Sequence, residues 1–413
     1  MSEILFLTHR IPFLPNRGDK IRSHHLLRKL ASMGPVHVGC FYERTEDRSS
    51  VAALDAITAS HCVVQRSKPL VLAGAQAVLS GKPVSLTAFH SAKLSAWVER
   101  TLDARPISTI VVFSGQMGQY IPKEFAGRVI IDLCDVDSAK FESYAEAGER
   151  VWLNAREGRL LAAEEDRLAR LCDATVLISK AEATLFRSRL SDPEAAQVKV
   201  IGNGVDASTF DPATVPAHKA MVSDHGPHLV FTGQMDYRPN EAAALWTIEQ
   251  LLPVIHQRYP SARFHVVGRS PTPALLKHDG GNGVHVWGAV PDVRPFLAGA
   301  TCVLAPLLIA RGVQNKVLEA MAMARPVLLT EQAATGIGAS DGEHWMVCRP
   351  DLQAMLKRLS QVLDFPEAAA QMGQAARDFV LFEHDWDAVL APMDALVSGR
   401  GLPVATMRAR HAA

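Results

Sequence analysis

The sequence predicts an α/β protein built from two Rossmann-like domains. With 413 residues, the chain exceeds the usual size of a single hydrophobic core. Short β-rich runs alternate with amphipathic helical patterns, which is the rhythm of a parallel sheet. The alternation breaks off over residues 206–227 and then starts again. We therefore expect an N-terminal domain over 1–205, a linker over 206–227 and a second domain over 228–382.

The first domain is expected to begin with a strand, a helix and a strand, at Glu3–Thr8, Lys20–Met33 and Val36–Phe41. Later strands are expected at His61–Val64, Thr109–Phe113, Val129–Leu133, Thr175–Ser179 and Val198–Ile201, with a long charged helix around Arg150–Leu171. The turn signal Asn203-Gly204-Val205-Asp206 then closes this domain.

The second domain repeats the alternation. Its expected strands are Leu229–Thr232, Phe264–Val267, Val284–Trp287, Cys302–Ala305 and Val327–Thr330, and its expected helices include Glu241–Tyr259 and Gln314–Ala324. Helical patterns at Pro366–Phe382 and Trp386–Val397 precede a polar tail over 399–413. Ligands of open parallel sheets bind outside the carboxyl ends of the strands, so two such sheets that face each other would place the functional site in a cleft between them.

Composition excludes several classes of protein. Lys plus Arg and Asp plus Glu both number 43, so no overall field favours nucleic acid. The six cysteines are scattered singly, without metal-ligand spacing, as in reduced cytoplasmic proteins. The apolar run before Thr8 is too short for a signal peptide, and the longest weakly polar stretch, Pro69–Leu79, is about half the length of a spanning helix. We expect a cytoplasmic protein.

The segment Leu304–Thr330 carries the strongest chemical signal. A buried strand ends at Pro306, a loop reaches Gly312, and a helix begins near Gln314. Free amides and the positive dipole end of such a helix attract phosphate, and Lys316 adds a full charge in the first turn. Glu319 shares a helix face with Lys316 and suits a pair of ribose hydroxyls. On local evidence alone, an ordinary strand–loop–helix unit with a surface Lys–Glu pair fits equally well.

A family resemblance favours the anion site. Leu318-Glu319-Ala320-Met321-Ala322 resembles half of the signature of retaining glycosyltransferases of family 4, whose GT-B fold consists of two facing Rossmann-like domains. The resemblance implies that Glu319 holds the donor ribose and that Lys316 binds the diphosphate. The amides of Gly312, Val313, Gln314 and Asn315 would bind the diphosphate as well. The first Glu of the signature is replaced by Arg311, whose charge suits the diphosphate leaving group.

Other segments recur in the order found in that family: Ile201–Asp206, Leu229–Gly233 and Val266–Gly268. By resemblance, Gly233 contacts the donor. The family places a basic residue after this glycine, where the chain has Gln234, so Arg238 is the expected substitute phosphate contact. A C-terminal helix around 383–398 is expected to pack back on the first domain.

In the first domain, Gly18 opens a helix where such enzymes set a glycine loop close to the reacting sugar, although a turn glycine explains it as well. Asp132 and Asp135 end an expected strand, and Asp135 could bind or activate an acceptor hydroxyl. Asp135-Val136-Asp137 also spells a DxD pattern of metal-dependent transferases. Because that pattern belongs to another architecture, we expect no metal and no cofactor.

The resemblance is strongest to the sugar transferases of exopolysaccharide clusters associated with exosortase and PEP-CTERM sorting. It implies a hexosyltransferase that uses a UDP- or GDP-sugar and a glycan or polyprenyl-diphosphate-linked acceptor, with peripheral contact to the inner face of the cell membrane. Three alternatives stay open: a nucleotide-sugar 2-epimerase on the same fold, a catalytically inactive scaffold that binds sugar nucleotides, and a polysaccharide-binding protein without a nucleotide site.

Overall fold

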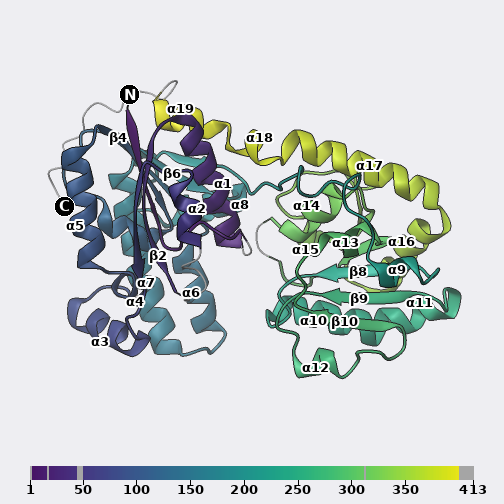
Figure 1. The fold of residues 1–413 in the computed structure, drawn as a ribbon. Coiled ribbons are helices and arrows are strands. Elements are labelled where there is room, and N and C mark those ends of the chain that lie inside the picture. Colours follow the sequence, from purple (N-terminus) through teal and green to yellow (C-terminus); the bar gives the residue numbers. More distant parts are fainter. Residues whose placement is uncertain (1, 16–17, 44–49, 311–312, 400–413) are drawn as a thin grey trace. The chain divides into compact units, whose positions relative to one another are not determined.

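The computed structural model describes residues 2–15, 18–43, 50–310 and 313–399 (Figure 1). The chain divides into two units. The first is Met1–Gly202 together with the segment from Leu390 onward, and the second is Asn203–Val389. Residues 206–227 therefore belong to the second unit, as does α17 (Pro366–Glu383).

The first unit contains, within the residues described, seven parallel strands in the order β3-β2-β1-β4-β5-β6-β7. The strands are β1 Glu3–Thr8, β2 Val36–Tyr42, β3 Ser60–Gln65, β4 Ile107–Phe113, β5 Arg128–Cys134, β6 Ala174–Leu177 and β7 Val198–Val200. The helices are α1 Gly18–Met33, α2 Val51–Asp55, α3 Leu70–Ser80, α4 Val84–Ala88, α5 Ala92–Ala104, α6 Asp137–Glu146, α7 Val151–Leu171, α8 Lys180–Arg189 and α19 Pro392–Ser398. The strand order reverses between β1 and β4, which is the switch point of a doubly wound sheet.

The second unit repeats this order with six parallel strands among the described residues, β10-β9-β8-β11-β12-β13. Its strands are β8 His228–Thr232, β9 Arg263–Val267, β10 Val284–Gly288, β11 Cys302–Ala305, β12 Val327–Thr330 and β13 Met346–Cys348. Its helices are α9 Lys219–Val222, α10 Arg238–Trp246, α11 Leu252–Arg258, α12 Pro273–Leu276, α13 Arg294–Ala298, α14 Asn315–Ala322, α15 Glu331–Ala334, α16 Leu352–Asp364 and α17, and α18 Trp386–Leu390 reaches the unit boundary. The switch point lies between β8 and β11. The two sheets confirm the predicted fold class of two Rossmann-like domains.

The strands form because their side chains are apolar on both faces, as a sheet covered by helices on both sides requires. Every residue of β1, β8, β11 and β12 is buried. Each unit has its own apolar core around its sheet. The sheets thus hold the loops at their carboxyl ends in fixed positions.

The C-terminal helix α19 packs on the first unit. Lys29 on α1 donates a hydrogen bond of 2.7 Å to Asp394, and Arg128 at the start of β5 donates one of 3.0 Å to the carbonyl of Leu396. The hydroxyl of Thr109 on β4 donates to the carbonyl of Val397 at 3.4 Å. These contacts tie the end of the described chain to the sheet of the first unit.

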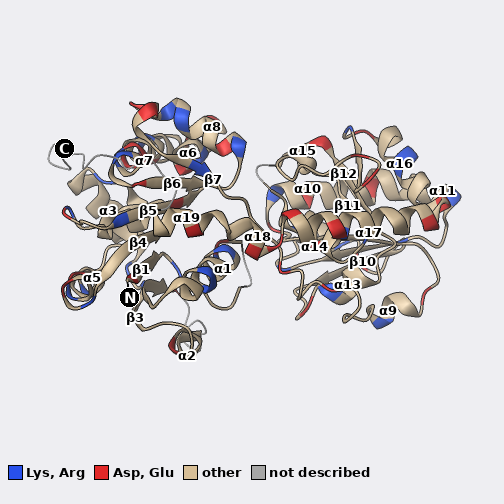
Figure 2. Ribbon diagram, turned by 90° about the horizontal axis from the view of Figure 1, so that it is seen from above, with Lys and Arg blue, Asp and Glu red and all other residues tan. Residues whose placement is uncertain are grey.

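Lys and Arg are interspersed with Asp and Glu over both units, in keeping with the formal net charge of zero (Figure 2). Of the helices that the structure describes, none has both the length and the apolar character needed to cross a bilayer.

Candidate functional site

Two glycines lie at the carboxyl ends of neighbouring strands of the second sheet, β8 and β9. Gly233 follows β8 with φ +154°, and Gly268 follows β9 with φ +150°. The amide of Gly233 donates to the carbonyl of Val267 at 3.1 Å, and a Cβ on Gly268 would lie 1.6 Å from the Gly233 carbonyl oxygen. Side chains are therefore excluded at both positions, which leaves main chain exposed at this edge.

Lys316, in the first turn of α14, reaches this glycine edge. Its ammonium donates a hydrogen bond of 2.6 Å to Oδ1 of Asn240 and lies 4.4 Å from the ring centroid of Phe231. A Cβ on Gly233 would come within 2.9 Å of the same ammonium. Burial lowers the pKa of Lys316 to about 7, against the opposing effect of the Glu319 charge. The structure thus places a cation beside the bare main chain after β8.

Glu319 lies one helical turn further along α14, on the same face as Lys316. Burial raises the pKa of its carboxyl to about 7, and the charge of Lys316 opposes this rise. The two groups therefore titrate as a coupled pair. Such perturbed, paired groups at a sheet switch point are typical of a functional site.

The other residues that the sequence predicts to bind the nucleotide-sugar donor lie around the start of α14. Gln314 is its N-cap, and Val313 packs against the positive-φ Gly336. Oδ1 of Asn315 is buried and accepts no hydrogen bond from the described residues. The first N–H groups of a helix point outward along its axis, so this end of α14 offers hydrogen-bond donors to a ligand. Arg311 and Gly312 lie outside the described residues.

Sequence reasoning missed two residues of this site. Arg269, directly after Gly268, donates a hydrogen bond of 2.5 Å to Oε1 of Gln234, so a cation does lie beside the position where a basic residue was expected. Asn240 orients Lys316. Arg238, the expected substitute, is exposed at the first turn of α10. Arg269 could have been found in the sequence from its place directly after the family segment Val266–Gly268. Nothing in the sequence indicated Asn240.

In the first unit, Asp132 is a structural residue. Nε of Arg22 on α1 donates to its carboxylate at 2.8 Å, and both side chains are buried. The same guanidinium also donates to the carbonyls of Ile201 and Gly202. The carboxylate of Asp132 is therefore engaged by Arg22.

Asp135, three residues later, is exposed. Loss of hydration, together with the neighbouring charges of Glu182 and Asp137, raises the pKa of its carboxyl to about 6. A carboxyl that gains a proton near neutral pH is suited to general acid–base chemistry.

Gly18 begins α1, and a Cβ there would meet no atom within 4 Å. The residue after it, Asp19, binds Arg10 and lies 3.2 Å from Nε2 of His9. His9 is buried at the end of β1, with its ring 5.7 Å from that of Phe113. Among the residues that the structure describes in this unit, none requires glycine at position 18.

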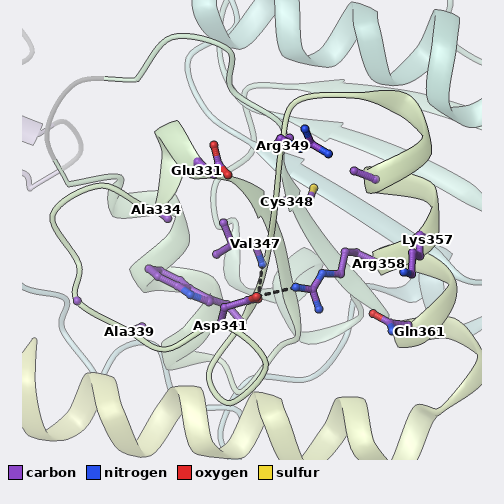
Figure 3. A pocket seen from close by; sticks show the side chains of 13 residues that line it. Glu331, Ala334, Ala339, Asp341, Val347, Cys348, Arg349, Lys357, Arg358 and Gln361 are labelled. Carbon is purple, nitrogen blue, oxygen red and sulfur yellow. Dashed lines mark hydrogen bonds and ion pairs between the residues drawn. The ribbon is translucent and has the colours of Figure 1, made fainter.

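An open pocket of about 740 Å³ lies elsewhere in the second unit, beside β13, α15 and α16 (Figure 3). Asp341 closes one side, accepting 2.6 Å and 2.8 Å hydrogen bonds from Arg358 and the amide of Val347. Of the expected site residues that the structure describes, none lines this pocket. Over the ranges that the structure describes, no three His, Cys, Asp or Glu side chains are grouped to hold a metal ion.

Part of the second unit matches a known protein family. Residues 226–364 match the model of the family "Glycosyl transferases group 1". A glycogen synthase of Mycobacterium tuberculosis is 24% identical over 264 residues, which are 59% of this chain and 58% of that protein. The chain thus spans less than two thirds of the length of the curated relatives that it matches.

Solved structures show the same fold over nearly the whole chain. Sucrose-phosphate synthase from Thermosynechococcus elongatus superposes with a TM-score of 0.67 at 16% identity, covering 97% of this chain and 99% of that one. Anabaena HepE in complex with UDP-glucose gives a TM-score of 0.67 at 14% identity, covering 97% and 100%. The chain therefore has the GT-B fold, and Lys316 and Glu319 lie within residues 226–364, the stretch that matches the group 1 glycosyl transferase model.

Proposed function

We propose that the chain is a glycosyltransferase that moves a hexosyl group from a UDP- or GDP-sugar to a hydroxyl of an acceptor. The observation that carries this proposal is the Lys316–Glu319 pair at the β8/β11 switch point, within the stretch that matches the group 1 family. The pair joins a phosphate-binding cation to a ribose-binding carboxylate on one helix face. The UDP-glucose bound to HepE makes UDP-sugars the first donors to test.

In the proposed reaction, the bond between the sugar C1 and the diphosphate oxygen breaks, and its electron pair leaves with the nucleoside diphosphate. The acceptor oxygen forms the new bond to C1, and its proton passes to a base, for which Asp135 is the candidate. Lys316, Arg269 and the first amides of α14 would stabilise the departing charge, with Arg311 and Arg238 as further cations. The resemblance of the Glu319 segment to retaining enzymes favours retention at C1. No step in this scheme requires a metal.

The biological setting belongs to the same proposal. The segments 10–30, 132–141 and 311–323 resemble exopolysaccharide transferases associated with exosortase, which favours a glycan or polyprenyl-diphosphate-linked acceptor at the cytoplasmic face of the membrane. Such an acceptor implies peripheral contact with the bilayer.

The test is nucleotide release from a panel of UDP-, GDP-, ADP- and TDP-sugars, with and without lipid-linked acceptor and EDTA. Wild type, Glu319→Ala and the matched control Glu343→Ala, an exposed carboxylate of the same unit, are compared. Release from one donor that survives EDTA, fails in Glu319→Ala and persists in Glu343→Ala supports the proposal. Product analysis separates transfer from 2-epimerisation.

A catalytically inactive scaffold is the second candidate, because Arg311 and Gln234 replace an acidic and a basic residue of the family pattern. It predicts donor binding that depends on Glu319 and Lys316, without release of nucleotide under any acceptor condition.

A further inference from the structure

The pocket beside β13 is distinct from the site around Lys316 and Glu319. In the sheet of the second unit, β11 and β12 lie between β8, which Lys316 approaches, and β13. Neither Lys316 nor Glu319 lines the pocket. Its volume of about 740 Å³ falls within the range of small-molecule sites. The second unit thus has room for a small molecule at the edge of its sheet as well.

One wall of this pocket is held in place by its own hydrogen bonds. Oδ1 of Asp341 accepts from the amide of Val347 at 2.8 Å, and Oδ2 accepts from Nη2 of Arg358 at 2.6 Å (Figure 3). The carbonyl of Trp345 accepts from the amide of Gly342 at 2.8 Å, which closes the turn after Asp341. A wall that is already ordered loses little conformational entropy when a ligand binds.

Two cations of the pocket lining have no partner of this kind. Arg349 directly follows β13, and Lys357 lies on α16. Both side chains are exposed, and neither makes a hydrogen bond or an ion pair with a residue that the structure describes. Their charges are therefore available to a ligand.

The carboxylates of the lining do not cancel these two charges. Asp341 is paired with Arg358, which leaves Glu331 on α15 as the carboxylate without an ion pair among the described residues that line the pocket. Two further acids stand outside the lining. Asp351 caps α16 by accepting from the amide of Ala354 at 2.9 Å, and Glu343 lies 4.0 Å from Nε2 of His344. The lining thus carries an excess of positive charge, which favours an anion.

Trp345 adds an unsatisfied donor to the same lining. Its side chain is 2% exposed, and its indole N–H donates to none of the residues that the structure describes. Buried donors in folded proteins are nearly always paired, so an unpaired one calls for a water, an ion or a ligand. This N–H favours a ligand that carries acceptor oxygens.

The lining suits a phosphorylated sugar better than a bare phosphate ion. The guanidinium of Arg349 and the ammonium of Lys357 are groups that bind phosphate oxygens. The side chains of Glu331 and Gln361 offer acceptors for sugar hydroxyls. In Figure 3, Glu331 and Lys357 come from opposite sides of the pocket, on α15 and α16. Small apolar side chains between them, such as Val347, suit the C–H groups of a sugar ring.

We propose that this pocket binds a phosphorylated monosaccharide, at a site separate from the Lys316–Glu319 pair. Arg349 and Lys357 supply the positive charge for the phosphate, and Glu331 accepts hydrogen bonds from hydroxyls of the sugar. The proposal concerns binding alone, so it holds whether or not the chain transfers sugar.

The test is titration calorimetry of the full chain with glucose 1-phosphate and with mannose 1-phosphate. Glucose and inorganic phosphate are the two halves of the first probe. We expect at least one sugar phosphate to bind about tenfold more tightly than either half, because only the whole molecule makes the phosphate and the hydroxyl contacts together.

Arg349→Gln/Lys357→Gln should weaken this binding about tenfold or more, because two charged partners of the phosphate are lost. Arg349→Lys/Lys357→Arg keeps both charges and should bind within a few fold of wild type. Lys219→Gln/Lys277→Gln, which removes two exposed lysines of the same unit outside the pocket, is the matched control. All four positions are exposed, so the circular dichroism and urea unfolding of wild type should be retained.

Lys316→Gln separates this pocket from the donor site and should leave the binding of sugar phosphates unchanged. The proposal is overturned if neither sugar phosphate binds, if Arg349→Gln/Lys357→Gln binds like wild type, or if inorganic phosphate or glucose binds as tightly as the sugar phosphates. Binding that is lost in Lys316→Gln and kept in Arg349→Gln/Lys357→Gln would overturn it too, because the ligand would then occupy the donor site. Since no turnover is measured, failure of the proposed transferase activity leaves this result unaffected.

Discussion

The ammonium of Lys316 donates a hydrogen bond of 2.6 Å to Oδ1 of Asn240, and Nδ2 of the same amide donates to the carbonyl of Gln234 at 2.9 Å. Asn240 is buried on α10, whereas Lys316 comes from α14. An amide can hold an ammonium in place without neutralising it. Asn240 therefore positions the Lys316 amine beside Gly233 without adding a charge of its own.

Asn240→Ala is expected to weaken the binding of UDP or GDP about tenfold, because Lys316 loses the partner that positions it. Asn240→Asp should weaken binding as well, since the new carboxylate would pair with the ammonium. Titration calorimetry with the nucleoside diphosphate measures both, with the exposed Gln374→Ala on α17 as the control. Unchanged affinity in both variants would show that Lys316 does not depend on Asn240.

The pKa of Lys316, lowered to about 7 by burial, gives nucleotide binding a pH dependence. Above that pH the Lys316 amine is largely neutral in the free site, and a bound diphosphate must draw a proton onto it. Affinity should therefore fall as pH rises from 7 to 9, by at most about tenfold per unit. Lys316→Arg stays charged and should flatten the profile. A wild-type dissociation constant that is flat over this range would contradict a neutral Lys316.

The fold could be predicted from sequence because its strands are continuous apolar runs. The strands at Glu3–Thr8 and Cys302–Ala305 have the predicted bounds. Strand β13 was missed, since a strand of only three residues gives no periodic signal. The predicted helix Glu241–Tyr259 is interrupted by a π turn at Thr247–Leu251, which hydrophobic periodicity does not report.

The site could be predicted only where its residues share one element. Lys316 and Glu319 lie on one helix, so their spacing places them on one face. Asn240 is 76 positions from Lys316, and Arg269 meets Gln234 only because β8 and β9 are paired. Asp132 and Asp135 look alike in the sequence, but the tertiary contact with Arg22 separates their roles.

The buried pair of Arg22 and Asp132 gives a stability prediction for the first unit. Asp132→Ala removes the carboxylate that pairs with the buried Arg22 guanidinium, which should cost about 3–5 kcal/mol of unfolding free energy in urea. Arg22→Met/Asp132→Leu should recover part of this loss. Arg170→Ala, which breaks an exposed pair with Asp166, should cost less than about 1 kcal/mol. A small loss in Asp132→Ala would argue that Asp132 is free for chemistry after all.

A row of hydrogen bonds fixes the protons of two buried histidines in the second unit. The indole of Trp287 is only a donor, so Nδ1 of His265 must accept at 3.1 Å. Nε2 of His265 then carries the proton and donates to Nδ1 of His228 at 2.9 Å, and Nε2 of His228 donates to the carbonyl of Asp224 at 3.0 Å. If Nδ1 of His265 were protonated, its N–H would face the N–H of Trp287, and the hydrogen bond between them would be lost.

Acid should therefore destabilise the second unit. Burial, together with the charges of His228, His285 and His218, lowers the pKa of His265 to about 3. Below its ordinary pKa of about 6.5 the unfolded chain takes up a proton that the folded chain refuses, so stability is present above that pH and falls below it. Between pH 7 and pH 5 the loss from His265 should be about 2 kcal/mol. Urea unfolding at both pH values measures this loss of unfolding free energy. His265→Gln cannot titrate at this position, so its loss between pH 7 and pH 5 should be smaller than that of wild type by about 2 kcal/mol. Equal losses in the two proteins would show that His265 does not set the acid limit of this unit.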